Sequence, residues 1–226
     1  MARQSAVRGG TGTNWLLDPE LPFSRNIILQ LLLAVFVVFW IVMAISPTDR
    51  IQWLMENVLV VAAFFTLLFT YKAFRFSNLS YLLIFLFLCV HVFAAHYTYQ
   101  NTPVDQWLKA SFHFQRSYFD RVVHFLFGLC LAYCLRELLI RAADLRNFWS
   151  YGIPVMTILG FSALFEIVEM GAASAAGQAG ADYLGLQGDV LDTQKDMLMG
   201  LAGALISMGT LAIILRKTRH AKPSRS

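Results

Sequence analysis

Six long runs of apolar residues alternate with short polar segments along the chain. The runs cover approximately positions 27–45, 54–71, 79–97, 119–139, 151–170 and 197–215. Each run approaches the length of about 20 apolar residues that a helix needs to cross the hydrocarbon core of a bilayer. Backbone polar groups in hydrocarbon must be hydrogen-bonded within their own segment, so these runs must be helices. The pattern therefore predicts an all-α fold, a polytopic membrane bundle of about six transmembrane helices.

The composition agrees with a membrane protein and excludes other classes. Of the 226 residues, 58% are hydrophobic and 14% are charged, whereas soluble domains carry about 25% charged residues. No soluble segment interleaves basic with aromatic residues, so nucleic-acid binding is not indicated. The three cysteines lie inside apolar runs, where they are expected to pack as small hydrophobic residues.

The distribution of lysine and arginine predicts the orientation in the membrane. An even number of spans puts both termini on one side. With the N-terminus inside, thirteen basic residues are internal and five external. The internal ones are Arg3, Arg8, Arg25, Lys72, Arg75, Arg136, Arg141, Arg146, Arg216, Lys217, Arg219, Lys222 and Arg225, and the external ones are Arg50, Lys109, Arg116, Arg121 and Lys195. Positive charge is retained on the cytoplasmic side, so we expect a multi-pass protein of the bacterial plasma (inner) membrane with both termini cytoplasmic.

This orientation divides the chain into three parts. Residues 1–26 form a cytoplasmic N-terminal tail, residues 27–215 form the six-helix transmembrane domain, and residues 216–226 form a basic cytoplasmic tail. The basic tail is expected to be attracted to anionic lipid headgroups.

Acidic residues show the opposite bias, because ten of the fourteen fall on the predicted outer side. Five of the six spans bring polar groups to their outer ends. In chain order these groups are Glu56, then His91 and His96, then Asp120, Arg121 and His124, then Glu166 and Glu169, and finally Asp189, Asp192, Gln194, Lys195 and Asp196. We therefore predict a single polar pocket at the extracytoplasmic face, built from residues far apart in sequence.

The spacing and chemistry of these groups suggest separate roles. Pairs three or four residues apart share a helix face, and a carboxylate inside hydrocarbon costs about 2.5–3.5 kcal/mol, so such groups usually face partners in the bundle. As catalytic candidates we take Glu166, Glu169, Asp120 and His124, and as ligands of a divalent metal ion His96, Asp189, Asp192 and Asp196. Glu56, His91, Arg121, Gln194 and Lys195 would line the rest of the pocket.

Simpler interpretations compete with this one for several residues. Asp120 and Asp192 each open an apolar helix, where an acidic cap is favourable in any protein. Glu56 can act as a partner of the helix dipole, and His91 as an ordinary hydrogen bonder between helices. Glu166 and Glu169 lie near a helix C-terminus, where negative charge opposes the dipole, although an ion-pair network with Arg121 and Lys195 would explain them structurally.

Four sequence runs resemble the YjdF-type family of bacterial inner-membrane proteins. The runs are FDRVVHF from Phe119, LRE from Leu135, FEIVE from Phe165, and YLGLQGDVLDTQKDM from Tyr183. The chain has Leu186 and Leu191 where members of that family often carry Thr and Trp, and these departures concern loop packing more than the acidic set. The resemblance implies membership and topology, and no activity. The order Asp-Arg-x-x-His, then Asp-x-x-x-Asp, is distantly similar to VanZ-type proteins, which are linked to glycopeptide resistance.

Three functions remain open from the sequence. A metal in the outer pocket could activate water against an envelope lipid or a cell-wall-related substrate. The pocket could instead bind a ligand or protein partner without catalysis, and the small residues of the last span, such as Gly200 and Gly203, would suit a homo-oligomer as well as the fold. Transport is disfavoured, because the inner stretches 60–69, 125–135, 152–164 and 200–215 contain no ionisable side chain other than cysteine and tyrosine. Membrane lipids are the partners expected in every case.

Overall fold

The computed structural model describes residues 16–17, 21–113, 116–176 and 189–220, and these parts of the chain are helical with no strand. Their elements are η1 (Phe23–Arg25), α1 (Ile27–Met43), α2 (Arg50–Thr70), α3 (Asn78–His96), α4 (Pro103–Phe112), α5 (Phe119–Ala143), α6 (Trp149–Ala176) and α8 (Asp192–His220). The prediction of an all-α membrane bundle is confirmed.

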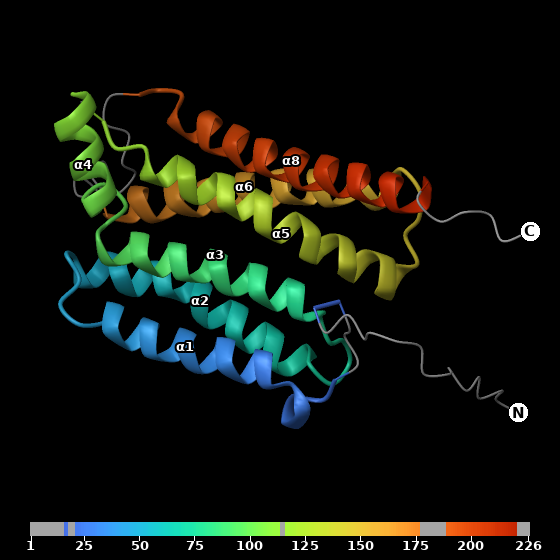
Figure 1. Ribbon diagram of the computed structural model, residues 1–226. Coiled ribbons are helices and arrows are strands. Elements are labelled where there is room, and N and C mark those ends of the chain that lie inside the picture. Colours follow the sequence, from blue (N-terminus) through green and yellow to red (C-terminus); the bar gives the residue numbers. More distant parts are fainter. Residues whose placement is uncertain (1–15, 18–20, 114–115, 177–188, 221–226) are drawn as a thin grey trace, which may run out of the picture.

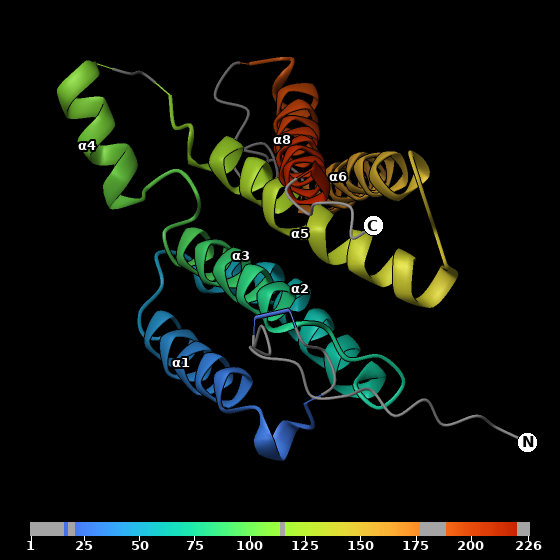
Figure 2. The same cartoon turned by 45° about the vertical axis from the view of Figure 1, so that its right-hand side comes forward.

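The long helices form two groups of three that meet along α3 and α5. Helices α1, α2 and α3 make one group and α5, α6 and α8 the other, as both ribbon views show (Figures 1 and 2). Helix α4 is short and lies at the end of the bundle where α3 ends and α5 and α8 begin (Figure 1). We refer to this end as the α4 end. Helix α1 begins, and α8 ends, at the opposite end of the bundle.

Five of the helices are long and apolar enough to cross a membrane, namely α2, α3, α5, α6 and α8. Helix α1 is apolar but has only 17 residues, which at 1.5 Å per residue gives about 25 Å. Several helix boundaries differ from those of the apolar runs, and the changes at α6 and α8 are the largest. Helix α6 continues through residues 171–176, beyond the end of its apolar run at position 170, and α8 begins five residues before its apolar run and ends five residues after it.

The helices begin at polar side chains that bind free backbone N–H groups. Asn26, Asp49, Ser77 and Thr102 accept hydrogen bonds from backbone N–H groups in the first turns of α1, α2, α3 and α4, respectively. Four N–H groups are left without a partner at each helix start, and such caps satisfy part of that requirement. The polar segments between the apolar runs therefore determine where each span begins.

The closest helix pair is α5 with α8, which contact each other through backbone atoms. A Cβ atom placed on Gly128 of α5 would lie 1.9 Å from the carbonyl oxygen of Gly200, and one placed on Gly203 of α8 would lie 2.1 Å from that of Phe125. Ala132 and Ala204 are fully buried in the same seam. The small residues noted in the sequence thus serve packing within the bundle, where they let two helix backbones approach closely.

Large apolar side chains cover much of the outside of the bundle. Val38 is 63% exposed, Phe69 75% and Ile167 59%, and α1 contains no buried residue. Such a surface is expected where hydrocarbon, and not water, surrounds the helices.

The close approach of α5 and α8 predicts a large effect of one methyl group. We expect Gly128→Ala to destabilise the protein by about 1–3 kcal/mol, because the added carbon overlaps the backbone of α8. Gly160→Ala in α6 is the matched control, since nothing lies within 4 Å of its added carbon, and it should be neutral or slightly stabilising. Thermal unfolding of both variants in detergent measures the difference, and equal stability of the two would contradict the packing described here.

Candidate functional site

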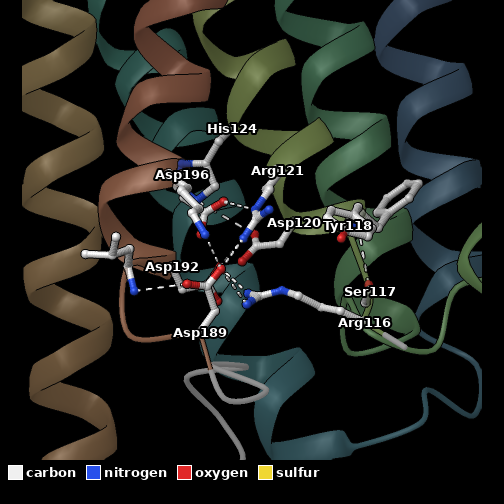
Figure 3. A network of polar contacts seen from close by, with 12 residues as sticks. Arg116, Ser117, Tyr118, Asp120, Arg121, His124, Asp189, Asp192 and Asp196 are labelled. Atoms are coloured by element: carbon white, nitrogen blue, oxygen red, sulfur yellow. Dashed lines mark hydrogen bonds and ion pairs between the residues drawn. The ribbon is translucent and has the colours of Figure 1, made fainter. Parts of the chain in front are cut away.

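Two arginines and two aspartates form a dense ion-pair cluster at the α4 end (Figure 3). Arg121 Nη2 of α5 lies 2.9 Å from Asp189 Oδ2 and 3.0 Å from Asp192 Oδ1. Arg116, which precedes α5, pairs with the same two carboxylates, at 3.1 Å from Asp189 Oδ2. Arg116 therefore joins the segment before α5, and Arg121 joins α5 itself, to the two aspartates at the start of α8.

Lys195 and Asp196 extend this cluster along α8. Lys195 Nζ donates to Asp189 Oδ2 at 2.6 Å. This hydrogen bond, the Leu191 backbone N–H and Arg121 together lower the pKa of Asp189 from 3.8 to about 2. Asp196 is buried, and its Oδ1 faces Arg121 Nε at 3.8 Å without a hydrogen bond. Asp189 is thus the carboxylate that the surrounding cations keep ionised.

His124 lies between two carboxylates one turn deeper in α5. Its Nε2 atom is 3.3 Å from Glu166 Oε1 of α6 and 3.7 Å from Asp120 Oδ1 of its own helix. His124 and Glu166 are buried, and Asp192 and Asp196 also act electrostatically on the imidazole. An imidazole held by carboxylates is the arrangement used for proton transfer in many enzymes.

Glu169 joins these groups to a second polar set formed by α2 and α3. It interacts electrostatically with Asp120, Glu56, Glu166 and Asp196. Glu56 itself is buried and is bonded to Tyr99, whose hydroxyl lies 3.1 Å from Glu56 Oε2 and 2.8 Å from His91 Nδ1. His91 Nε2 completes the set, 3.1 Å from the carbonyl oxygen of Glu56. The expectation that His91 bonds between helices is met.

Two of the candidate residues lie elsewhere. His96 Nδ1 lies 2.8 Å from the carbonyl oxygen of Met43, so this side chain contacts α1. Gln194 is exposed on α8.

The cap that the sequence suggested for Asp120 is not present. Asp120 lies in the first turn of α5, and the N-cap of this helix is Tyr118.

Of the four proposed metal ligands, Asp189, Asp192 and Asp196 lie around Arg121, whereas His96 contacts α1. Within the described residues, no group of three or more His, Cys, Asp or Glu side chains is arranged to hold a metal ion. The carboxylates of Asp189 and Asp192 instead face guanidinium groups. The described residues therefore give no support to the expected metal site, which stays a prediction, and no step below depends on a metal ion.

Three contributors were missed as site residues in the sequence analysis. Arg116 lies in the segment before α5, and Tyr99 lies just beyond α3, so neither shows a helical spacing to the acidic residues. Asp105 of α4 is buried, accepts a hydrogen bond from Thr102 Oγ1 at 2.7 Å, and accepts the Tyr118 backbone N–H at 3.1 Å. The Thr-Pro-x-Asp order at 102–105 is a signal for a capped helix start that could have revealed this contact.

The comparisons with known proteins agree with this architecture. The family model described as "Predicted membrane protein (DUF2238)" matches residues 28–217. The chain belongs to this family. It is also 38% identical over 173 residues to "Inner membrane protein YjdF" of Escherichia coli (strain K12), which covers 74% of this chain and 81% of that protein. No solved structure matches the chain.

Family membership establishes a multi-pass inner-membrane protein, and the resemblance to YjdF-type proteins is confirmed. Residues 177–188, which include most of the loop part of the last resembling run, lie outside the described residues. Within the described part, the FDRVVHF, FEIVE and DVLDTQKDM runs supply the cluster at the α4 end: Asp120, Arg121, His124, Glu166, Glu169, Asp189, Asp192, Lys195 and Asp196.

The lowered pKa of Asp189 predicts a pH-dependent contribution to stability. The carboxylate titrates lower in the folded protein (about 2) than its ordinary value of 3.8, so its stabilising effect is complete above about pH 4 and is lost as the pH falls toward 2. Wild type should therefore be more stable than Asp189→Asn near neutral pH, with the gap closing between about pH 4 and 2.

Thermal unfolding in detergent across this pH range measures the gap. Asp144→Asn is the matched control, because Asp144 pairs with Arg146 at the surface, where ion pairs contribute little. A gap for Asp189→Asn that does not depend on pH would show that its charge is not what joins α5 to α8.

Proposed function

We propose that this protein binds a phosphate-bearing ligand of the cell envelope, a lipid headgroup or a cell-wall precursor, and that His124 transfers a proton in its conversion. The observation that carries this proposal is the position of His124 Nε2, 3.3 Å from Glu166 and 3.7 Å from Asp120, beside two arginines. A histidine in this setting can take a proton from a water or hydroxyl nucleophile and hold it as an imidazolium beside the carboxylates.

Arg116 and Arg121 supply the chemistry for the phosphate group. The planar guanidinium donates two parallel hydrogen bonds to phosphate or carboxylate oxygens. Both arginines now use these donors on Asp189 and Asp192. A phosphate ligand would take over part of this hydrogen bonding, while the aspartates keep the arginines oriented.

The depth of the site suits a headgroup. Arg121, His124 and Asp196 lie in the first turns of their membrane-spanning helices. The neighbouring α4 exposes Trp107 and Phe112, whose rings contact each other, and aromatic residues of this kind favour the interface between headgroups and hydrocarbon. A ligand at this level would be a molecule that is itself held in the membrane surface.

The side of the membrane follows from the distribution of basic residues. With thirteen lysines and arginines assigned to the inner side and five to the outer, the α4 end faces away from the cytoplasm. The substrate would accordingly be presented in the outer leaflet or outside the membrane, and the basic segment after position 215 would lie at the cytoplasmic surface.

Binding without catalysis is the second candidate, and one observation favours it. Asp189 Oδ2 receives Arg116, Arg121 and Lys195 together, which is also what a structural clamp between α5 and α8 requires. In that case the pocket would recognise its ligand and His124 would only contribute hydrogen bonds.

A pair of conservative variants separates catalysis from binding. His124→Gln should retain phospholipid binding but lose about 10²–10⁴-fold in turnover, the usual contribution of a general acid–base group. The double change Arg121→Gln/Asp189→Asn removes one charge of each sign and should weaken binding about tenfold or more, because a hydrogen bond to a charged group contributes about 1.5–3 kcal/mol.

The assay uses nanodiscs containing phosphatidylglycerol, phosphatidylethanolamine or a polyprenyl pyrophosphate, with product analysis for turnover and native mass spectrometry for retained lipid. Arg146→Gln/Asp144→Asn is the matched control, since it removes an exposed pair. Unchanged binding in the Arg121 double variant would refute the phosphate site. Elemental analysis of the same samples tests the metal hypothesis: stoichiometric metal that is lost in Glu166→Gln would replace this proposal with a metal-dependent one.

The orientation has its own test. Green fluorescent protein fused after residue 226 should be fluorescent and alkaline phosphatase fused there inactive, because both termini are proposed to be cytoplasmic. Alkaline phosphatase inserted in the segment between α3 and α4 should be active and serves as the control. An active phosphatase at the C-terminus would move the cluster to the cytoplasmic face and remove the envelope substrate from the proposal.

A further inference from the structure

The cations at the α4 end are concentrated on two of its carboxylates. Arg116, Arg121 and Lys195 all pair with Asp189, and both arginines also pair with Asp192. Residues 114–115 and 177–188, which lie outside the described residues, contain no lysine, arginine or histidine. The other carboxylates of this end therefore depend on few positive charges.

Four of these other carboxylates gather around His124, and they come from three helices. Its Nε2 atom lies 3.3 Å from Glu166 of α6 and 3.7 Å from Asp120 of α5. Glu169 of α6 interacts electrostatically with Asp120, Glu166 and Asp196 of α8. One imidazole can offset at most one of the four negative charges, so this group has an excess of acid.

Asp196 supplies a second and independent observation, because one of its oxygens lacks a hydrogen bond. The residue is 3% exposed, and its Oδ1 accepts no hydrogen bond from any residue that the structure describes. Arg121 Nε lies 3.8 Å away, which is too far for a hydrogen bond. Figure 3 shows Asp196, His124 and Asp120 gathered around Arg121. A buried acceptor without a donor is costly, so a donor on a bound ligand would stabilise this carboxylate.

The group is accessible on one side. The side chain of Asp120 is 37% exposed, whereas those of His124 and Glu166 are each 7% exposed, and Glu169 is also partly exposed. A ligand can therefore contact Asp120 and Glu169 while its other groups reach the arginines.

We propose that Asp120, Glu169 and Asp196 bind a primary ammonium group, so that the phosphate-bearing ligand of the proposed function also carries an amine. A primary ammonium has one positive charge and three N–H donors, which matches carboxylates from three helices. That amine and phosphate belong to one ligand rests on the proposed function above, but the ammonium site does not. The ligand class is then an aminoalkyl phosphate, with its phosphate on the arginines and its amine on the carboxylates.

Other cations fit the arrangement less well. A metal ion holds carboxylate oxygens at about 2.0–2.6 Å, and no three acidic or histidine side chains among the described residues are arranged in this way. A quaternary ammonium has no N–H donor and is usually held by aromatic faces, whereas the ring of Tyr118 is stacked by Arg121.

The first arm of the test compares lipid headgroups. Native mass spectrometry measures which lipid is retained from nanodiscs that contain equal amounts of phosphatidylethanolamine, phosphatidylglycerol and phosphatidylcholine. Wild type should retain phosphatidylethanolamine about tenfold or more over the other two, because they lack the ammonium charge or its N–H donors. Glu169→Gln and Asp196→Asn should each reduce this preference. Glu137→Gln is the matched control, since Glu137 lies at the opposite end and accepts from Ser77, Ser80 and Arg141.

The second arm uses a probe without phosphate. Ethanolamine hydrochloride should raise the thermal midpoint of wild type in detergent, because a ligand that binds only the folded state stabilises it. Ethylene glycol with the same concentration of sodium chloride should not, and EDTA is present throughout to exclude a metal effect. Glu169→Gln should fold, because it removes repulsion among carboxylates, and should lose the response to ethanolamine. Asp196→Asn is the second variant in this arm.

The two arms separate the source of the amine and the two proposals. A preference in the lipid arm alone identifies a lipid headgroup, and a response in the soluble arm alone identifies a free amine. Retained lipid without preference, together with no response to ethanolamine, would keep the phosphate site and overturn the ammonium site. A response to ethanolamine with no retained lipid would do the reverse. Discrimination that both Glu169→Gln and Asp196→Asn preserve would also overturn the ammonium site.

Discussion

The contact between α5 and α8 leaves no room for side chains at its centre, and the polar cluster depends on that contact. Gly128 and Gly203 each lie against a backbone carbonyl of the other helix. Helices this close can be held only in one register, because a shift along the axis would drive larger side chains into the seam. Their first turns are thereby fixed side by side, which places Arg121 of α5 against Asp192 of α8.

Both ends of the bundle hold carboxylates at least partly away from solvent, but the groups that bond to these carboxylates differ. At the end opposite α4, Glu137 accepts hydrogen bonds from Ser77, Ser80 and Arg141, so its charge is matched by fixed donors. At the α4 end, the two polar sets around Arg121 and around Tyr99 bring together seven carboxylates (Glu56, Asp120, Glu166, Glu169, Asp189, Asp192 and Asp196), three cations (Arg116, Arg121 and Lys195) and two histidines (His91 and His124). In a low-dielectric setting such an excess of acid favours bound protons or a cationic partner.

The sequence pattern predicted the boundaries of the membrane helices to within a few residues. It predicted which residues gather in the site, but not which of them contact each other. Hydrocarbon forces apolar runs to be helical, so little freedom remained for α2, α3 or α5. The distribution of acidic residues predicted at which end of the bundle they gather. The contacts of each single side chain, however, depend on how the helices pack against one another. His91 and His96 are five positions apart, about 140° around a helix, and consequently one bonds α2 and the other α1. Arg116 reaches Asp189 across 73 positions, a contact that no local spacing can show.

The segment before α5 shows how the cluster is kept in place from outside the membrane helices. Thr102 caps α4 and also donates to Asp105, and Asp105 in turn accepts the N–H of Tyr118. Since Tyr118 is next to the first residue of α5 and two positions from Arg116, this buried carboxylate ties α4 to the segment that carries the arginine. Arg121 in addition stacks on the Tyr118 ring at 5.2 Å. Helix α4, which exposes aromatic side chains, is thus connected to the two arginines through the hydrogen bond between Asp105 and Tyr118. A molecule bound against α4 would therefore act on the ion-pair cluster through these neighbouring residues.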